Sequence, residues 1–345
     1  MMVSTDTAVQ ELDEDMNVFN RVEPFEASDE FIRQSVAQAD LPSLMVTLAM
    51  LTGDTSLIGP EVKPPVPPMR VEIAPQGGMS KEMQEEARRR ATAALIAFRD
   101  SGQKGVGIPS ESLLTQCMQY LLPRDIDELR PLLEHEMGFA TDPGAPGWTH
   151  ERVAPGVKFR VAVIGAGVSG IAAGYRLQQT QLDFTMYEKN EDVGGVWWEN
   201  RYPGCRLDTP NFAYSLSFAQ KQDWPQQFSR QPEIQSYLAT VATASGLRRH
   251  IRFGTEVDEM RFNEDRATWT LSVRDSSGRV TQEEFNAVIT AVGILSRPSL
   301  PDIPGLESFQ GRIIHSAAWP KGLDLKGKRV AMVGTGASAF QIGPS

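Results

Sequence analysis

The chain has 345 residues, enough for two or three domains of ordinary size. Its hydrophobic content of 41% and charged content of 23% are those of a soluble globular protein. The formal net charge of -10 argues against a nucleic-acid partner, because such a partner requires a basic face.

The cysteines and the N-terminus indicate the cellular compartment of the protein. Cys117 and Cys205 make no disulfide framework and lack metal-ligand spacing, so no metal site is predicted. Residues 1–15 are acidic and lack the basic-then-apolar layout of a signal peptide. No segment approaches the roughly 20 apolar residues of a membrane span. We therefore predict a cytoplasmic protein with no membrane partner.

Residues 1–142 are predicted to form an N-terminal helical extension that begins with a polar tail. Helical patterns follow Ser28, and the apolar stripe of the second pattern ends at Gly53. A longer helix is expected over 80–101, and a further amphipathic helix over 113–121. Prolines are dense over 59–78, which excludes a helix there and predicts an extended connector.

Nothing in this extension is typical of a catalytic site. The charged side of the 80–101 helix favours a solvated face over a binding patch. His135 lies between two glutamates and is more typical of an exposed histidine than of a metal ligand. Because short helices cannot bury such apolar stripes alone, we expect them to dock on the following domain or on a second subunit. We predict a homodimer through residues 1–142.

The segment from Phe159 to Asp208 contains the strongest pattern in the chain. An apolar run over 159–164 predicts a buried parallel strand, followed by a glycine-rich turn and a helix. A second strand over 184–187 ends at Glu188, near the spacing expected for an acidic ribose ligand. The first glycine permits the tight turn, the second lets the backbone approach a pyrophosphate, and the third lets helix pack close to strand.

This order of elements predicts a dinucleotide-binding site. A turn that binds nothing is disfavoured, because strand, turn, helix, strand and acid all fall in register. The residues predicted to hold the cofactor are Gly165, Ala166, Gly167, Val168, Ser169, Gly170 and Glu188.

The rest of the chain predicts a second site of the same kind. Strands are expected over 251–257 and 287–291, with a hairpin between them that turns through 275–278. A strand over 328–333 then enters a second glycine-rich turn, formed by Gly334, Thr335, Gly336, Ala337, Ser338 and Ala339. Two dinucleotide sites in one chain suggest a flavin on one domain and a nicotinamide cofactor on the other.

The predicted fold is α/β, with two Rossmann-like dinucleotide-binding domains behind an α-helical N-terminal domain. We place the helical extension at 1–142, the first part of the FAD-binding domain at 143–320 and the start of the NADP-binding domain at 321–345. A βαβ unit needs about a dozen residues to cross back to its neighbour. The second domain is therefore expected to be truncated.

Two further motifs carry a resemblance to a known family. The segment 309–320 matches FxGxxxHxxxWP through Phe309, Gly311, His315, Trp319 and Pro320. The segment 194–208 matches [AG]GxWxxxx[FY]P[GM]xxxD. Over residues 155–345 the chain resembles the type I Baeyer–Villiger monooxygenases. Its helical extension looks like that of the 4-hydroxyacetophenone monooxygenase branch.

The resemblance implies FAD and NADPH as cofactors, with a ketone and O₂ as substrates. One oxygen atom would be inserted into an aryl or cyclic ketone through a flavin peroxide, giving an ester or lactone. It implies that the flavin is lined by Gly195, Val196, Trp197, Asp208 and Tyr214, with Val257 on the adenine. It also implies that the nicotinamide cofactor is faced by Arg206, Leu207 and Asp208, with its pyrophosphate on residues 335–341, which end at Gln341.

Asp208 is the catalytic candidate, while the resemblance gives His315 a structural, domain-coupling role. In the family, an arginine that pairs with this carboxylate and the ligands of the NADP 2′-phosphate lie beyond the position of Ser345. Activity and solubility of residues 1–345 alone are therefore expected to be poor.

Several alternatives stay open at this point. Trp197, Trp198 and Tyr202 also fit plain core aromatics, and Asp208 fits an ordinary loop carboxylate. The same chemistry could oxygenate the nitrogen of amines or the sulfur of sulfides instead of ketones. The chain could also be an inactive fragment that acts only in subunit association. No residue identifies the ketone.

Overall fold

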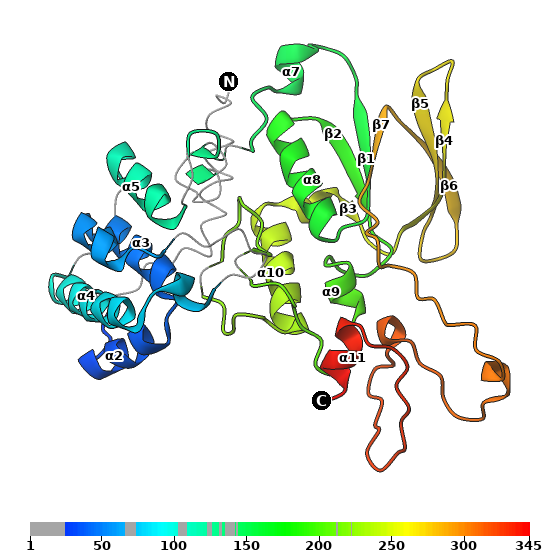
Figure 1. The fold of residues 1–345 in the computed structure, drawn as a ribbon. Helices are drawn as coiled ribbons and strands as arrows, with labels where there is room; N and C mark the ends of the chain where they lie inside the picture. The colour runs from blue at the N-terminus through cyan, green and yellow to red at the C-terminus, as the bar shows by residue number, and fades with distance from the viewer. Residues whose placement is uncertain are drawn as a thin grey trace. The chain divides into compact units, whose positions relative to one another are not determined.

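The structure is a computed structural model (Figure 1). It describes residues 25–65, 74–102, 109–122, 126–130, 133–134, 142, 144–211, 213–221 and 223–345. These residues fall into two compact units, one within 21–143 and the other within 144–345. His135 lies outside the described residues.

The first unit is helical. Its helices are α2 (Asp29–Gln38), α3 (Leu41–Thr52), α4 (Lys81–Asp100) and α5 (Glu111–Leu121), which confirms the helices predicted from the sequence. Ser28, Asp40, Ser80 and Ser110 cap them, each accepting a hydrogen bond from the backbone N–H three residues later. Gly53 ends α3 in the left-handed region, at φ 73°, which costs glycine little.

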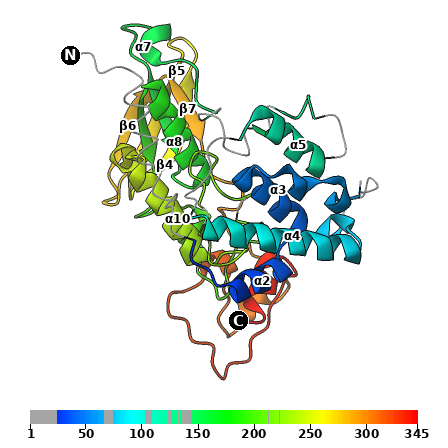
Figure 2. The same ribbon diagram turned by 90° about the vertical axis from the view of Figure 1, so that its left-hand side faces the viewer.

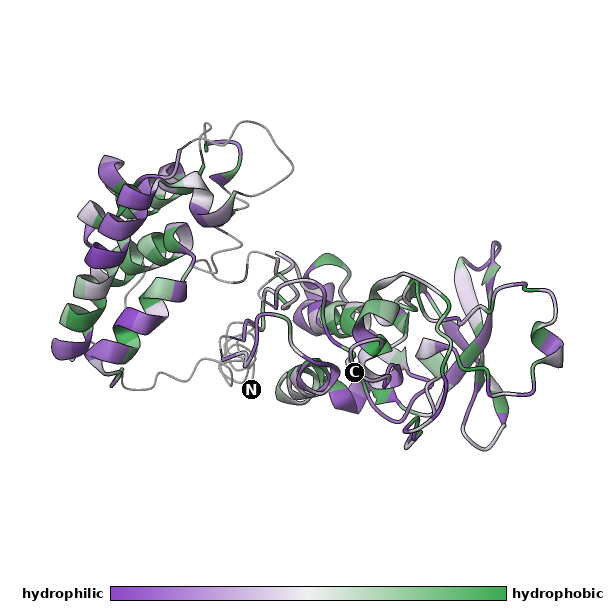
Figure 3. Cartoon of the chain, turned by 60° about the horizontal axis from the view of Figure 1, so that its bottom comes forward, coloured by the Kyte–Doolittle hydropathy of each residue, from purple (hydrophilic) through white to green (hydrophobic). Residues whose placement is uncertain are grey.

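The core of the helical unit is built from the facing sides of these helices. Leu41, Met45 and Leu48 of α3 are fully buried, together with Ala87 and Ala91 of α4. Small alanines let the helices approach closely, and Figure 2 shows α2, α3 and α4 side by side. Figure 3 shows hydrophobic residues on their facing sides and hydrophilic residues outside. The apolar stripes expected to dock elsewhere therefore cover one another within this unit.

The prediction of an extended connector over 59–78 is wrong for Pro60–Val62 and Pro75–Gly78, which form the turns η3 and η4. Gly59, Lys63 and Ala74 beside these turns have extended backbone. A further 3-10 turn, η2 (Thr55–Ile58), precedes the connector. Proline fits the first position of such a turn, because its fixed φ suits the turn and its missing N–H has no partner to lose. The exclusion of a long helix is confirmed for these parts, and residues 66–73 lie outside the described residues.

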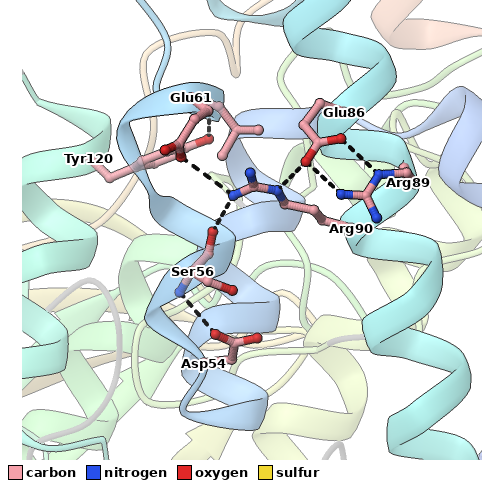
Figure 4. Close-up of polar contacts among 8 residues, drawn as sticks. Asp54, Ser56, Glu61, Glu86, Arg89, Arg90 and Tyr120 are labelled. Carbon is pink, nitrogen blue, oxygen red and sulfur yellow. Dashed lines mark hydrogen bonds and ion pairs between the residues drawn. The ribbon is translucent and has the colours of Figure 1, made fainter.

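A polar network fastens the turns η2 and η3 to α4 and α5 (Figure 4). The Arg90 guanidinium donates to the Ser56 carbonyl at 2.7 Å and to Glu86 Oε1 at 2.7 Å. The Tyr120 hydroxyl donates to the carbonyl of Val62 at 2.6 Å. Backbone carbonyls of irregular turns lack ladder partners, so these side chains satisfy them.

The second unit contains a parallel sheet of order β3-β2-β1-β7 (Figure 1). The strands are β1 (Arg160–Ile164), β2 (Asp183–Tyr187), β3 (Ile251–Arg252) and β7 (Ala287–Thr290). Val161 is in register with Phe184 on one side and Ala287 on the other. The first predicted strand, the one after it and the strand over 287–291 are confirmed.

Helix α8 (Val168–Thr180) packs on one face of this sheet with α10 (Gln231–Ala244) beside it, and an antiparallel sheet packs on the other face. The further helices of the unit are α7 (His150–Val153), α9 (Val196–Glu199) and α11 (Ala337–Ile342), with 3-10 turns η5 (Leu247–His250), η6 (Leu306–Ser308) and η7 (Ser316–Ala318). The second sheet has the order β4-β5-β6: Glu256–Asn263, Thr268–Arg274 and Val280–Phe285. Its Leu271 and Phe285 join Ala162 and Tyr187 in one core cluster. The predicted hairpin is confirmed, with Gly278 at φ 84° in its turn.

Two strand predictions are wrong. The expected strand over 251–257 is two strands in different sheets, because the chain turns at Gly254 (φ 59°), whose N–H donates to the Asn190 carbonyl. The segment 328–333 forms no strand, and Val330 and Val333 are 61% and 77% exposed. A strand requires a ladder partner, and no strand among the described residues pairs with this segment.

Candidate dinucleotide-binding site

The first glycine-rich turn connects β1 to α8 with little room for side chains. Gly165 has φ 100° and donates to the Tyr187 carbonyl at 2.8 Å. A Cβ there would lie 2.6 Å from the carbonyl oxygen of Ala291. A Cβ on Gly170 would lie 2.9 Å from the carbonyl carbon of Gly165, so helix and turn touch backbone to backbone. This geometry requires glycine for the tight turn and for close packing.

A second glycine pair faces this turn. Gly194 donates to the Ala166 carbonyl at 3.0 Å, and a Cβ on Gly195 would lie 3.1 Å from the Gly167 Cα. The first backbone bond of α8 runs from Ile171 N–H to the Gly167 carbonyl at 3.0 Å. The N–H groups of Val168, Ser169 and Gly170 precede that bond, so they have no partner inside the helix.

This cradle of bare backbone fits the pyrophosphate of a dinucleotide, because added Cβ atoms would fill the space and N–H groups attract phosphate oxygens. The residues present therefore fit the flavin cofactor that the sequence predicts.

Glu188 lies at the carboxyl end of β2 and is only 3% exposed. Its Oε2 accepts from the Ala166 N–H at 2.8 Å, while Oε1 accepts from the backbone N–H and side-chain Nδ2 of Asn190 at 2.9 and 2.8 Å. A carboxylate has about four acceptor positions, so one remains for a ribose hydroxyl. Asn190, which the sequence reasoning missed, therefore holds this carboxylate in place.

A cavity of about 380 Å³ lies beside Asn190, the hydrogen-bond partner of Glu188. Its walls come from the end of β2, α9 and the segment after β7: Lys189, Asn190, Trp198, Glu199, Arg201, Ser296, Pro298 and Ala317. Lys189 pairs with Glu199 at 2.7 Å, and Asn190 Nδ2 donates to the same carboxylate at 3.2 Å. Chain order reverses at β1, between β2 and β7, and ligands of open α/β sheets bind at such a switch point. No sequence pattern predicts this cavity, because its walls come from three separate segments.

Aromatic residues form the wall next to the cradle. The indole N–H of Trp197 donates to the Tyr214 hydroxyl at 2.9 Å, and the two rings meet edge-on at 78°. Trp197 is buried in the core cluster, so the core alternative is correct for its packing, and its position beside Val196 and Gly195 is also compatible with a flavin wall. Trp198 is half-buried and stacks under the Arg201 guanidinium.

The segment 206–208 alternates between buried and exposed residues. Leu207 is buried, and its N–H donates to the Ser229 carbonyl at 2.9 Å. Asp208 next to it is exposed. Tyr202 is buried, and burial raises the pKa of its hydroxyl to about 12, so it stays protonated at neutral pH. Its hydroxyl donates to Gln341 Oε1 at 3.0 Å.

The remaining predicted residues lie on β4, in the second glycine-rich turn and in the 309–320 motif. Val257 is on β4, opposite Val273. In the second turn Gly334 has φ 126°, residues 334–337 are exposed, and Ser338 and Ala339 are half-buried. In the 309–320 motif, His315 Nδ1 accepts from the Ala317 N–H at 3.1 Å, which caps η7, and Trp319 packs against the core cluster. The Phe309 ring covers Gly311, leaving no room there for a Cβ, and Pro320 is half-buried.

Within the described residues, no helix is both long enough and apolar enough to cross a membrane. The described part of the chain also contains no group of three His, Cys, Asp or Glu side chains that could hold a metal ion.

Sequence comparison decides the family. A family model for flavin-binding monooxygenase-like proteins matches residues 158–344, which is more than half of the chain. The chain belongs to the flavin-binding monooxygenase-like family. Its relatives place this family member with the type I Baeyer–Villiger monooxygenases, which confirms the predicted resemblance. The 4-hydroxyacetophenone branch stays a prediction.

Three relatives show how much of a related protein this chain covers. A Baeyer–Villiger monooxygenase of Streptomyces coelicolor is 47% identical over 198 residues, which are 57% of this chain and 37% of the relative. One of Pseudomonas aeruginosa is 42% identical over 186 residues, or 54% of this chain and 34% of the relative. An uncharacterized monooxygenase of Sinorhizobium fredii is 33% identical over 321 residues, or 91% and 46%. This last match includes much of the helical unit.

Solved structures of the family are also similar. A complex of OTEMO with FAD and NADP is 41% identical over 54% of this chain and 36% of its own, with a TM-score of 0.49. A closed structure of cyclohexanone monooxygenase is 38% identical over 55% and 36%, also with a TM-score of 0.49. The chain therefore spans between a third and a half of the length of these relatives.

Proposed function

We propose that this protein is an FAD-dependent, NADPH-consuming monooxygenase that inserts one oxygen atom of O₂ into an aryl or cyclic ketone, giving an ester or lactone. The observation that carries the proposal is the bare glycine backbone at the start of α8, where Gly167 contacts Gly195, with the buried carboxylate of Glu188 on the Ala166 N–H. Family membership and the matching 309–320 motif support the same reading. Cytoplasmic localisation stays a prediction.

The chain's own residues would bind and orient the flavin. The N–H groups of Val168, Ser169 and Gly170 would donate to the pyrophosphate, and the last acceptor position of Glu188 would take a ribose hydroxyl. The Trp197–Tyr214 pair has a fixed geometry, because their hydrogen bond joins two partly buried rings. That pair would exclude water from one side of the cofactor.

Asp208 would supply a negative charge at the flavin side of the site. The buried Leu207 holds the backbone in place there, so the point from which the exposed Asp208 side chain extends is fixed. When bound and reduced by NADPH, the flavin supplies the activation of O₂. The second turn, Gly334 to Ala339, would hold the pyrophosphate of the nicotinamide cofactor.

A single incubation tests this proposal. Purified protein is mixed with FAD, NADPH, O₂ and an aryl ketone, and ester is sought by mass spectrometry. Ester formation that depends on all four additions is expected from a protein that extends over the full length of the relatives. Oxidation of amines or sulfides with ketones left untouched would overturn the ketone assignment and favour heteroatom oxygenation.

A homodimer through the helical unit also stays a proposal. The apolar stripes that first suggested it are now accounted for within the unit, so its support is limited to exposed Phe31 and Leu121, at 61% and 46%. Light scattering with and without residues 1–142 tests it. An equal number of subunits in both samples would overturn it.

A further inference from the structure

One side chain joins two segments that are more than 130 residues apart. Gln341 on α11 receives the N–H of Arg206 on its Oε1 at 3.1 Å and donates from Nε2 to the Arg206 carbonyl at 3.0 Å. The same Oε1 accepts from the buried Tyr202 hydroxyl at 3.0 Å. A single amide thus satisfies both backbone groups of one residue, as a strand neighbour would.

The backbone around this amide is closely packed. Gly204 has φ 75°, and a Cβ on it would lie 3.1 Å from the carbonyl carbon of Gln341 and closer still to its oxygen. Ile342, next along α11, packs against the core of the α/β unit. The Tyr202 hydroxyl also interacts with the side chain of Ser338 in the second glycine-rich turn. The second turn is therefore held on the loop over 202–206 by contacts of several kinds.

The position of these hydrogen bonds connects the second glycine-rich turn to the segment that contains Asp208. The chain continues from Arg206 directly to Leu207 and Asp208, and α11 directly follows the second turn. Any movement of α11 is thus transmitted to the backbone that positions Asp208. Two of the hydrogen bonds hold the Arg206 backbone, one at its N–H and one at its C=O, and the third holds the Gln341 amide on Tyr202.

We infer that Gln341 is a positioning residue, whose side-chain amide latches the second glycine-rich turn onto the loop that leads to Asp208. The latch consists of Gln341, Tyr202, Gly204 and Arg206. The role of the latch in catalysis rests on the proposed function. If the chain binds both cofactors, the latch sets the separation of the two dinucleotide sites. Hydride can pass between two cofactors only at short range, so this separation controls the rate of reduction.

Hydrogen exchange on residues 1–345 tests the latch without any cofactor. In the Gln341→Leu variant, the Arg206 amide loses its acceptor, so exchange in peptides covering 203–208 should rise about tenfold or more. Peptides covering 160–187 should not change. Gln282→Leu, on an exposed position of β6, is the matched control and should leave both regions unchanged.

Two conservative variants keep the test decisive if Gln341→Leu does not fold. Gln341→Glu retains the acceptor of the Arg206 N–H but loses the donor to its carbonyl, so exchange should rise less than with leucine. Tyr202→Phe removes one of the three bonds and should also give an intermediate rise. Unchanged exchange over 203–208 in these folded variants would overturn the latch.

The role of Gln341 in flavin reduction is tested separately in flavin-loaded protein. At saturating NADPH, Gln341→Leu should slow anaerobic flavin reduction at least tenfold, while flavin content, the affinity for NADPH and reduction by dithionite stay the same. Equal slowing by dithionite, or no slowing by NADPH, would overturn the positioning role. Protein that takes up no flavin in any variant would count against the proposed function, and the exchange measurement then decides the latch alone.

Discussion

Two glycines on α8 allow a paired test of the nucleotide turn. Gly170 and Gly174 lie on the same helix, one turn apart, and both have crowded surroundings. A Cβ on Gly170 would meet backbone, 2.9 Å from the Gly165 carbonyl carbon and closer to its oxygen. A Cβ on Gly174 would meet only the ends of flexible side chains, at 2.8 Å from Met186 Sδ and 2.9 Å from Leu247 Cδ2.

The two alanine variants should therefore differ. Ordinary contacts of a carbon atom begin near 3.3–3.5 Å, and the Gly165 carbonyl oxygen is the nearest atom, so Gly170→Ala must push the turn and the helix apart by more than about 1 Å. Overpacking against backbone costs about 1–3 kcal/mol, and the turn that moves is the one proposed to hold the pyrophosphate. In Gly174→Ala the side chains can yield, and alanine regains up to about 1 kcal/mol of helix propensity. That variant should be close to wild type in stability.

Urea denaturation followed by tryptophan fluorescence measures this difference. All six tryptophans lie within residues 144–345, so the signal reports the unit that contains α8. We expect Gly170→Ala to lose about 1–3 kcal/mol relative to Gly174→Ala, at similar denaturant dependence, together with most of its FAD uptake. Equal stability of the two variants would refute the packing argument, and equal FAD uptake would refute the assignment of the turn.

Three further predictions follow from single residues. Two arginines hold the pKa of Glu86 at about 2, against an ordinary 4.5, so its stabilisation is present above pH 4.5 and is lost as the pH falls through 2. The protection of α4 amides against hydrogen exchange, relative to the intrinsic rate at each pH, should therefore fall over that window in wild type and Glu85→Gln but less in Glu86→Gln. Asn190→Ala should weaken FAD binding, measured by fluorescence titration, about five- to tenfold, because Glu188 loses one hydrogen bond worth about 1 kcal/mol; an unchanged dissociation constant would contradict this role. Gly167→Asp should purify without flavin, since its side chain would fill the cradle with negative charge, and undiminished absorbance near 450 nm would refute this.

Local chemistry explains why many elements were predictable. The helices of the first unit begin at Ser28, Ser80 and Ser110, and each cap is a contact across three residues. The turn from β1 to α8 is likewise specified locally, because the backbone conformation of the turn itself requires its glycines. Such signals are complete within a short stretch of sequence, so they could be read before the tertiary structure was known.

Long-range packing decided the rest. The strand expected over 251–257 is divided because Gly254 bonds to Asn190, more than 60 residues earlier. The apolar run over 328–333 has the composition of a strand, but no described strand pairs with it, so composition alone misled the prediction.

The candidate site divides in the same way. The sequence by itself determined the glycine cradle, Glu188 and the family, because their residues are close along the chain and each performs its own task. Only the tertiary structure decided that Asn190 holds Glu188, and that Gln341 binds the backbone of Arg206. A side-chain amide carries no sequence mark of its partner. Which donor and acceptor it meets depends on how segments 135 residues apart are folded against each other.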